Sequence, residues 1–284
     1  MPELPEVETV KRKLEKRIVG SRINQIKILE RKQFLGDPQK ILGQRIKGLW
    51  RRAKILAIDV GNFSLLIHLK MTGQIIYLPG DKGKLISVGH PLPFSSDRLP
   101  NNTTRIVIGL DDGSWLFFND LRKFGWLKVL TGEQVVRELS GLGPEPLGED
   151  FTLELFRQKL TGTRRAIKIV LLDQSIVAGI GNIYANETLF KAGIDPRRRA
   201  DSLSLQDLIR LYRAIKSILA AAIEHNGTSA ADRAYLGPDA LPGHYQDFLK
   251  VYQREGERCS RCGGKVRKII QANRSTYFCP GCQK

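Results

Sequence analysis

Apolar residues recur every three or four positions near the start of the chain, a spacing that places them on one side of a helix. They are Val7, Val10, Leu14 and Ile18. Lysine and arginine occupy much of the rest of this segment, as is typical of a solvated helix face. The pattern predicts an amphipathic helix over residues 5–19 that stops at Gly20.

Short apolar segments separated by turn residues follow this helix and predict strands. The predicted strands are Ile23–Leu29, Ile55–Val60, Ser64–Leu69, Gln74–Leu78, Arg105–Leu110, Ser114–Asn119 and Trp126–Leu130. Gly61-Asn62 and Asp111-Asp112-Gly113 are typical of hairpin turns, whereas Gly80–Gly89 and Pro91–Asn102 interrupt the pattern as loops. Many short strands joined by turns favour a β-sandwich or a barrel.

The second half of the chain has helical periodicity instead. The segment Gly141–Gly148 contains two prolines and is predicted to be a linker. The predicted helices are Phe151–Leu160, Arg165–Leu172, Tyr184–Lys191 and Leu203–His225. Residues 228–245 contain two glycines and two prolines and are predicted to form a loop. A chain of 284 residues is long enough for more than one domain.

The net charge of the chain indicates what kind of molecule it binds. The sequence has 46 basic and 29 acidic residues and a net charge of +17, which favours a polyanion and nucleic acid first. An anionic membrane surface is the alternative, but no basic amphipathic helix with an aromatic apolar face supports it. The chain has no apolar segment of the 18 or so residues that a membrane span needs. Its acidic, proline-containing start is unlike a signal peptide, which predicts a cytoplasmic protein.

All four cysteines lie in the last thirty residues, as Cys259-x-x-Cys262 and Cys279-x-x-Cys282. Two such pairs in a cytosolic chain predict one structural Zn²⁺ held by four thiolates. A pair of disulfides is the alternative, and a reducing compartment disfavours it. Strands predicted at Lys265–Gln271 and Ser275–Phe278 would make a zinc-stapled hairpin, with Arg274 near its turn. An arginine there suits contacts to phosphates or bases.

The first six residues, Met-Pro-Glu-Leu-Pro-Glu, carry candidate chemistry. Removal of Met1 would leave Pro2 with a secondary amine, and an α-amine has a pKa near 8. Such an amine can attack an aldehyde-like carbon to form an iminium, while Glu3 or Glu6 moves protons. The alternative is structural, because proline suits the first turn of a helix and glutamate suits its positive end.

Four further places stand out, three of them because they combine charge with an unusual setting. Lys54 closes Arg-Arg-Ala-Lys before a strand, Met71 follows a strand end that begins at His68, and residues 120–125 join two strands. Each could be only a charged strand end, and a lone Met or Phe is more often part of a core. The fourth place carries no charge: Gly179 and Gly181 precede a helix and could cradle phosphate, although an ordinary tight turn explains them as well.

The two ends and the helical part together resemble bacterial formamidopyrimidine-DNA glycosylase. The motifs are Met-Pro-Glu-Leu-Pro-Glu at the start, Gly-Asn-Ile-Tyr-Ala from Gly181, and Arg-Ser-Thr-Tyr-Phe-Cys-Pro-Gly-Cys-Gln from Arg274. The resemblance implies an α+β fold with an N-terminal β-sandwich and leading helix, a helix-two-turn-helix domain and a C-terminal zinc finger. The implied domains are residues 1–131, a linker at 132–148, residues 149–245 and residues 246–284.

The resemblance also implies an activity: excision of oxidised purines, chiefly 8-oxoguanine and formamidopyrimidines, followed by β- and δ-elimination at the abasic site. By position, Pro2 would be the nucleophile, Glu3 the general acid/base, and Lys54 the lysine near the phosphate and damaged base. Residues that would fill the void left by the extruded base are Met71, Arg122 and Phe124. Residues that would contact the phosphates beside the lesion are Lys168, Asn182 and Arg274, with Asp173 and Glu187 as acidic supports.

Some positions depart from the family pattern. Leu121 stands where the family often has proline, Asn101–Thr104 lack the histidine common there, and the loop after Thr228 is unusual, so lesion preference stays open. One alternative is an enzyme that resembles endonuclease VIII, which Leu4 disfavours; another is a zinc-ribbon DNA-binding protein without chemistry, which Pro2, Glu3 and Lys54 together disfavour. The expected partner is damaged double-stranded DNA, bound by a monomer at the bacterial nucleoid with no membrane association.

Overall fold

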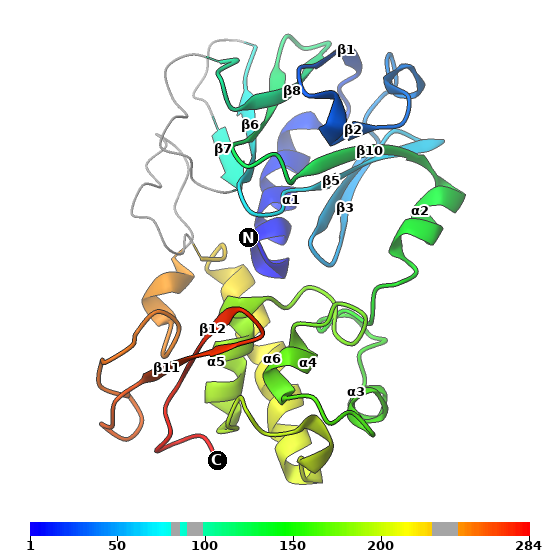
Figure 1. The fold of residues 1–284 in the computed structure, drawn as a ribbon. Helices are drawn as coiled ribbons and strands as arrows, with labels where there is room; N and C mark the ends of the chain where they lie inside the picture. The colour runs from blue at the N-terminus through cyan, green and yellow to red at the C-terminus, as the bar shows by residue number, and fades with distance from the viewer. Residues whose placement is uncertain (81–85, 90–98, 229–243) are drawn as a thin grey trace. The chain divides into compact units, whose positions relative to one another are not determined.

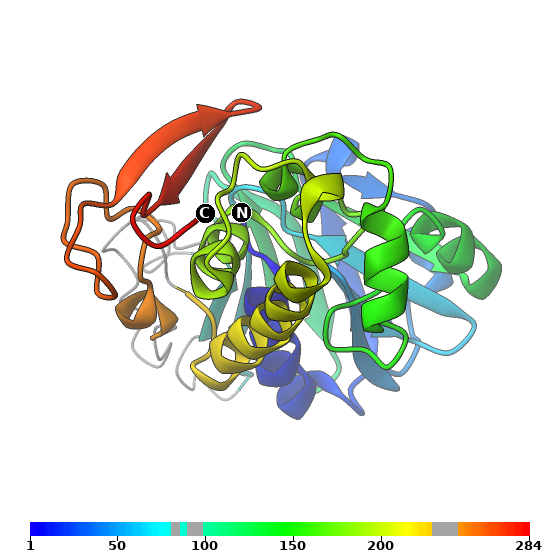
Figure 2. The same cartoon turned by 90° about the horizontal axis from the view of Figure 1, so that it is seen from below.

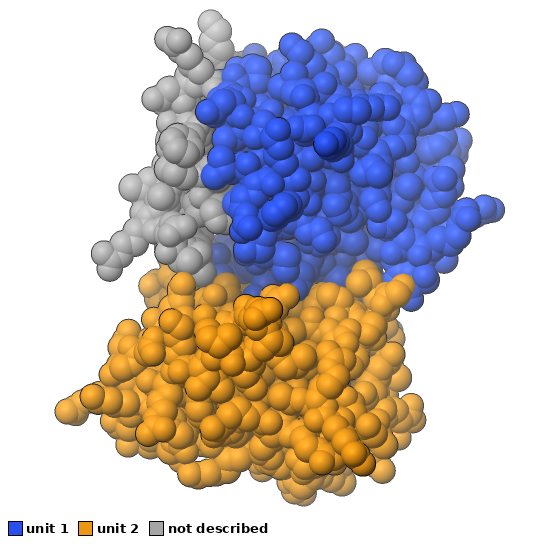
Figure 3. Space-filling model, in the orientation of Figure 1, with its two compact units in different colours: residues 1–140, 226–244 blue, residues 141–225, 245–284 orange. Residues whose placement is uncertain are grey.

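The computed structural model describes residues 1–80, 86–89, 99–228 and 244–284 (Figure 1). They form two compact units, shown in different colours in Figure 3. Unit 1 contains residues 1–140 and the described part of 226–244, and unit 2 contains residues 141–225 and 245–284. Most of the two predicted loops at 91–102 and 228–245 lies outside the described residues.

The leading helix is α1, Leu4–Ile18, which confirms the first prediction to within one residue at each end. Its four apolar positions are buried in the core of unit 1. The helix ends where Val19 turns to an extended conformation and Gly20 takes a φ of +98°, which a residue with a side chain rarely adopts.

Two five-stranded sheets make up most of the rest of unit 1, as the strand pattern predicted. The first contains, in spatial order, β1 (Ile23–Ile28), β8 (Thr104–Leu110), β9 (Trp115–Asp120), β6 (Gly73–Leu78) and β7 (Ile86–Gly89). The second contains β2 (Phe34–Leu35), β10 (Trp126–Thr131), β5 (Phe63–His68), β4 (Ile55–Asp59) and β3 (Gly48–Arg52). Short 3₁₀ helices, η1 (Arg31–Gln33) and η2 (Pro38–Lys40), lie on either side of β2.

Alternate residues of both sheets meet the buried side of α1 in one core. Ile75 and Phe118 enter it from the first sheet, and Ile58 and Ile67 from the second. This period of two is the pleat of a strand, which sends successive side chains to opposite faces. The sandwich therefore fixes which residues at the strand ends point outward.

Three strands and one helix were missing from the sequence prediction. β3 and β7 are edge strands, and Arg51-Arg52, interpreted as the approach to a strand, are the end of β3. Edge strands tolerate charged residues and short, irregular sequences, so they do not stand out as apolar segments. β2 has only two residues. Helix α2 (Gly132–Leu139) lies inside the predicted linker 132–148, where Thr131 accepts a capping hydrogen bond from Gln134 N.

Unit 2 contains four helices among its described residues, close to those predicted. They are α3 (Leu153–Leu160), α4 (Ile167–Leu171), α5 (Asn182–Ala192) and α6 (Leu205–Glu224), with 3₁₀ turns η3 (Ala200–Ser202) and η4 (Tyr245–Phe248). α6 begins two residues later than predicted because Ser204 caps it: Ser204 Oγ accepts from Asp207 N at 3.1 Å. Figures 1 and 2 show α5 beside α6, and their apolar residues share one core.

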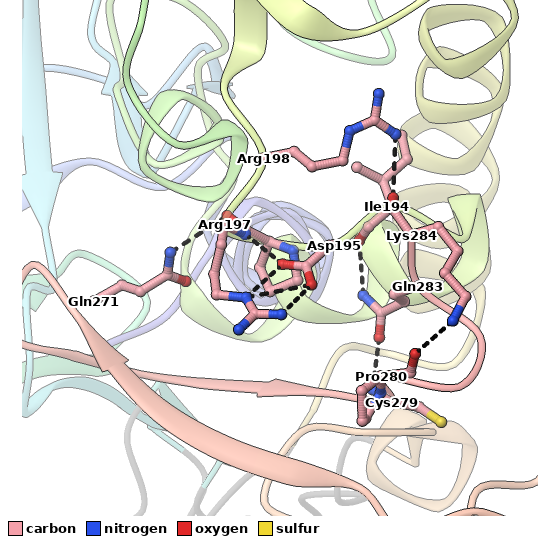
Figure 4. Close-up of polar contacts among 10 residues, drawn as sticks. Ile194, Asp195, Arg197, Arg198, Gln271, Cys279, Pro280, Gln283 and Lys284 are labelled. Carbon is pink, nitrogen blue, oxygen red and sulfur yellow. Dashed lines mark hydrogen bonds and ion pairs between the residues drawn. The ribbon is translucent and has the colours of Figure 1, made fainter.

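The last forty residues form a hairpin of β11 (Arg267–Gln271) and β12 (Arg274–Phe278), as predicted. Polar contacts fasten its base to the end of α5: Gln283 Nε2 donates to Ile194 O at 2.9 Å, and Gln283 Oε1 accepts from Cys279 N at 2.8 Å (Figure 4). Because compactness groups these residues with the helices, the division into a helical domain and a separate finger stays a prediction. Within the described ranges, no helix is long and apolar enough to span a membrane.

Candidate active site

Met1 is 40% exposed, but the residues directly after it are buried in unit 1. Pro2 and Glu3 are both buried, and Glu3 is only 2% exposed. Pro5 stands in the first turn of α1 and Glu6 closes the turn by accepting from Glu3 N at 2.8 Å, so the structural explanation of the motif holds for these two residues. Glu3 and Glu6 form a capping box at the start of the helix, so the buried Glu3 carboxylate also takes part in this turn.

Three charged groups surround the amine at the chain start. Burial, the largest effect, lowers the pKa of the Met1 amine; Glu3 and Glu6 raise that pKa and Lys54 lowers it again. After removal of Met1 the amine would belong to Pro2, at the next position of the same segment. The fold thus brings Glu3 and Lys54, which are about fifty positions apart in the sequence, close to the amine that precedes Pro2.

Lys54 is held by an unusual turn. It is 5% exposed and lies in the two-residue turn between β3 and β4. Ala53, directly before it, has a φ of +53°, a left-handed conformation that is uncommon for residues other than glycine. Strain of this kind persists where the surrounding structure imposes it and is frequent at functional sites.

Glu6 also binds a residue from far along the chain. Its Oε1 accepts from the Thr228 backbone N at 2.8 Å and from Thr228 Oγ1 at 3.1 Å. Gly227, directly before Thr228, has a φ of +75°, a left-handed conformation that favours glycine. Sequence analysis gave Glu6 as a possible proton carrier or a helix-start residue and not as a partner of Thr228, because a contact across 222 residues leaves no local signal.

The three predicted void-filling residues meet at the end of the two sheets. Met71 lies in the turn between β5 and β6, and Arg122 and Phe124 lie in the turn between β9 and β10. All three are exposed, with Met71 at 40% and Phe124 at 53%. The Arg122 guanidinium stacks on the Phe124 ring at 4.8 Å, which keeps a cation and an aromatic ring together at the surface.

His68, at the end of β5, is a residue whose role sequence analysis did not identify. Burial, and then Lys70 and Lys54, lower the pKa of His68 to about 3. Its Nδ1 accepts from Lys70 N at 3.0 Å, and its ring contacts Trp126. His68 is therefore a neutral imidazole at physiological pH that fixes the backbone just before Met71.

In unit 2, Lys168 and Asn182 converge on the finger hairpin. Lys168 Nζ donates to Ser275 O at 2.9 Å and to Thr276 Oγ1 at 2.6 Å, and Asn182 Nδ2 donates to Ser275 O at 3.0 Å. Lys168 is 0% exposed, so its ammonium supports β12 rather than facing solvent. Arg274, beside Ser275, is exposed.

The two predicted acidic supports act on backbone. Burial is the main effect on Glu187 and raises its pKa; its carboxyl accepts from the backbone N of residues 250–252 at 2.8–2.9 Å. Asp173 accepts from Ser175 and pairs with Arg165 at 2.8 Å, and these contacts lower its pKa. The turn before α5 is held by Gln174, whose Oε1 accepts from Gly179 N at 2.9 Å, so that amide is already used within the protein.

The cysteines form a metal site. All four are free, which excludes the disulfide alternative, and their sulfur atoms lie within 4.8 Å of one another. Cys259 Sγ is 3.7 Å from Cys282 Sγ, and Cys262 Sγ is 3.5 Å from Cys279 Sγ. Tetrahedral zinc with bonds near 2.3 Å requires sulfurs about 3.8 Å apart. The site fits one structural Zn²⁺, as predicted.

Family models cover most of the chain. The formamidopyrimidine-DNA glycosylase N-terminal domain matches residues 1–127, the H2TH domain of the same enzymes residues 142–234, and a zinc finger found in FPG and IleRS residues 256–284. A formamidopyrimidine-DNA glycosylase of Heliobacterium modesticaldum is 41% identical over the full length of both chains.

Solved structures of formamidopyrimidine-DNA glycosylases are also similar to this chain. A complex of Lactococcus lactis Fpg with DNA containing an abasic site has a TM-score of 0.86 and 36% identity over 99% of each chain. MutM in complex with DNA containing carbocyclic 8-oxo-G has a TM-score of 0.86 and 38% identity over 100% of each chain.

Acidification should destabilise unit 1 through His68. The unfolded chain protonates histidine near pH 6.5, but the folded protein does so only at about pH 3. Between these values the unfolded state binds more protons, so stability is lost as pH falls. From about pH 7.5 to pH 5 this loss is about 2 kcal/mol, and His68→Asn should largely remove it.

Urea unfolding followed by tryptophan fluorescence measures this, because Trp50, Trp115 and Trp126 all lie in unit 1. Equal acid sensitivity of wild type and variant would contradict the assignment of a neutral His68.

Removal of zinc should unfold the finger alone. The hairpin has only a small core, which includes Val251, Val266 and Tyr277, so metal binding supplies much of its folding free energy. Chelation should abolish hydrogen-exchange protection over residues 256–284 and leave tryptophan fluorescence unchanged. Protection that persists after the zinc is gone would show that the hairpin folds without metal.

Proposed function

Since the chain belongs to the formamidopyrimidine-DNA glycosylase family and is a base-excision repair glycosylase with abasic-site lyase activity, we propose that the Pro2 amine carries out its chemistry. The observation that supports this most is the buried setting of the chain start, with Glu3 and Lys54 beside the amine. Burial keeps a larger fraction of the amine neutral and nucleophilic at physiological pH.

The reaction begins once Met1 has been removed. The nitrogen of Pro2 attacks C1′ of the damaged nucleotide, the bond from C1′ to the base breaks, and the base leaves with a proton. Glu3 moves protons during this step and during opening of the sugar. The resulting iminium is an electron sink, so the 3′ and then the 5′ phosphate leave by β- and δ-elimination. Lys54 lies near the phosphate and the damaged base.

Recognition of the lesion requires that the damaged base is extruded from the DNA double helix. Extrusion costs a few kcal/mol, and Met71, Arg122 and Phe124 offset part of it by filling the void. Asn182 and Arg274 contact the phosphates beside the lesion. For Lys168 we propose a supporting role instead, because its ammonium is fully buried against β12. The zinc, held by the four cysteines, is structural and takes no part in the chemistry.

The substrate proposed is damaged double-stranded DNA with oxidised purines, chiefly 8-oxoguanine and formamidopyrimidines. The enzyme acts as a monomer at the bacterial nucleoid in the cytoplasm, without membrane association. Its net charge of +17 suits a polyanionic partner. The domains remain those proposed from the sequence, at residues 1–131, 149–245 and 246–284 with a linker at 132–148.

Borohydride should trap a covalent adduct between Pro2 and DNA containing an abasic site, because reduction converts the iminium to a stable amine. Pro2→Gly should lose most of this adduct. Pro5→Ala is the matched control, since it removes the other proline of the motif and should trap as the wild type does. Peptide mapping that places the adduct on Lys54 would overturn the assignment.

Arg274→Ala should weaken binding to all lesions alike, because a phosphate contact fixes register without reading bases. The loss should be about 1–3 kcal/mol, and the slope of log affinity against log salt should become shallower by about one unit. A salt titration on an uncleavable abasic-site analogue measures both. Arg267→Ala removes the same charge elsewhere on the hairpin and should change the affinity less. Equal losses of affinity in the two variants would show that Arg274 contributes only its charge and makes no specific phosphate contact.

A further inference from the structure

The two turns that carry Met71, Arg122 and Phe124 are joined beneath the surface by one carboxyl group. Asp120, the last residue of β9, is 0% exposed. Its Oδ2 accepts from Gly125 N at 2.7 Å and from Gln33 Nε2 at 2.9 Å. Its Oδ1 accepts a short hydrogen bond from Thr72 Oγ1. The two oxygens thus bind both turns at once.

Thr72 relays the contact from one turn to the other. Its hydroxyl donates to Asp120 and accepts from the backbone N of Arg122 at 3.0 Å. Thr72 follows Met71 directly, and Arg122 is two residues before Phe124. A single hydroxyl therefore sets the separation between the turn with the methionine and the turn with the arginine and the ring.

Both turns hold backbone conformations that need such support. Lys70, before Met71, has a φ of +50°, and Lys123, between Arg122 and Phe124, has a φ of +57°. At Gly125 a β-carbon would come within 2.7 Å of Phe118 and 3.1 Å of Asp120 Oδ2, so the second turn folds tightly over the carboxyl. Gln33 Nε2 also donates to Gly125 O at 2.8 Å and closes the arrangement from η1.

We propose that Asp120 and Thr72 are positioning residues for base extrusion. They hold the side chains of Met71, Arg122 and Phe124 at the spacing that lets all three enter the DNA double helix together. This rests on the void-filling role proposed above. Neither residue touches DNA in this account. Because filling the void assists extrusion of a base, loss of the link should slow excision of a damaged base more than cleavage at a site that has no base.

The test compares Thr72→Val, which keeps the shape and removes the hydroxyl, with Thr72→Ser, which keeps the hydroxyl. Under single-turnover conditions Thr72→Val should excise 8-oxoguanine about tenfold more slowly, equivalent to about 1.4 kcal/mol, and should cleave a ready-made abasic site at nearly the wild-type rate. 2-Aminopurine beside the lesion should show a correspondingly slower unstacking step. Thr72→Ser should keep the wild-type rates of 8-oxoguanine excision and of unstacking.

Lost stability alone must be separated from lost positioning. Ile58→Val removes one methylene from the core of the same unit, away from both turns, and should excise 8-oxoguanine as the wild type does. If Thr72→Val slows both substrates equally, or neither, the link is only structural and this inference is wrong. A wild-type protein that releases no damaged base would overturn the proposed function, and this inference with it.

Discussion

Burial of the first residues of the chain is the constraint on which the candidate site depends. Met1 is exposed, but Pro2 and Glu3 are buried and α1 begins directly after them. The apolar positions of α1 hold it in the core of the sandwich, so the helix cannot move without disrupting that core. A nucleophile attached to this helix is therefore preorganised by hydrophobic packing that is itself remote from the chemistry.

The same sandwich produces the surface around the site from its strand ends. The turns with Ala53-Lys54, Lys70-Met71 and Arg122-Lys123-Phe124 each contain one residue other than glycine at positive φ. Each such residue is adjacent to one proposed to act on DNA. Conformations of this kind cost free energy and last only where neighbours impose them, here buried groups such as Asp120 and His68. Rigid strands and strained turns together fix the direction of the exposed side chains that these turns carry.

Much of this followed from the sequence, and the rest did not for identifiable reasons. The helical period of α1, the short apolar segments between turns and the Cys-x-x-Cys spacing are local patterns, and all three predictions were confirmed. The edge strands β3 and β7 were missed because edges tolerate charge and irregularity. Thr131 and Gln134, the capping pair at the start of α2, were an available signal that went unused.

Contacts between distant positions gave no such signal. Glu6 meets Thr228, and Thr72 meets Asp120, only because the fold brings them together. Position in a family motif also did not reveal that the Lys168 ammonium is fully buried against β12. The role of each side chain therefore depends on which neighbours satisfy it, and a motif does not record that.

The central claim is that the reactive amine belongs to Pro2 and that burial lowers its pKa. A titration of the free enzyme with ¹⁵N-labelled proline, followed by NMR, measures this directly. The account predicts an amine resonance for Pro2 whose midpoint lies below the ordinary α-amine value of about 7.7–8.0. A midpoint at or above that range, or an amide resonance from a Pro2 still joined to Met1, would contradict it.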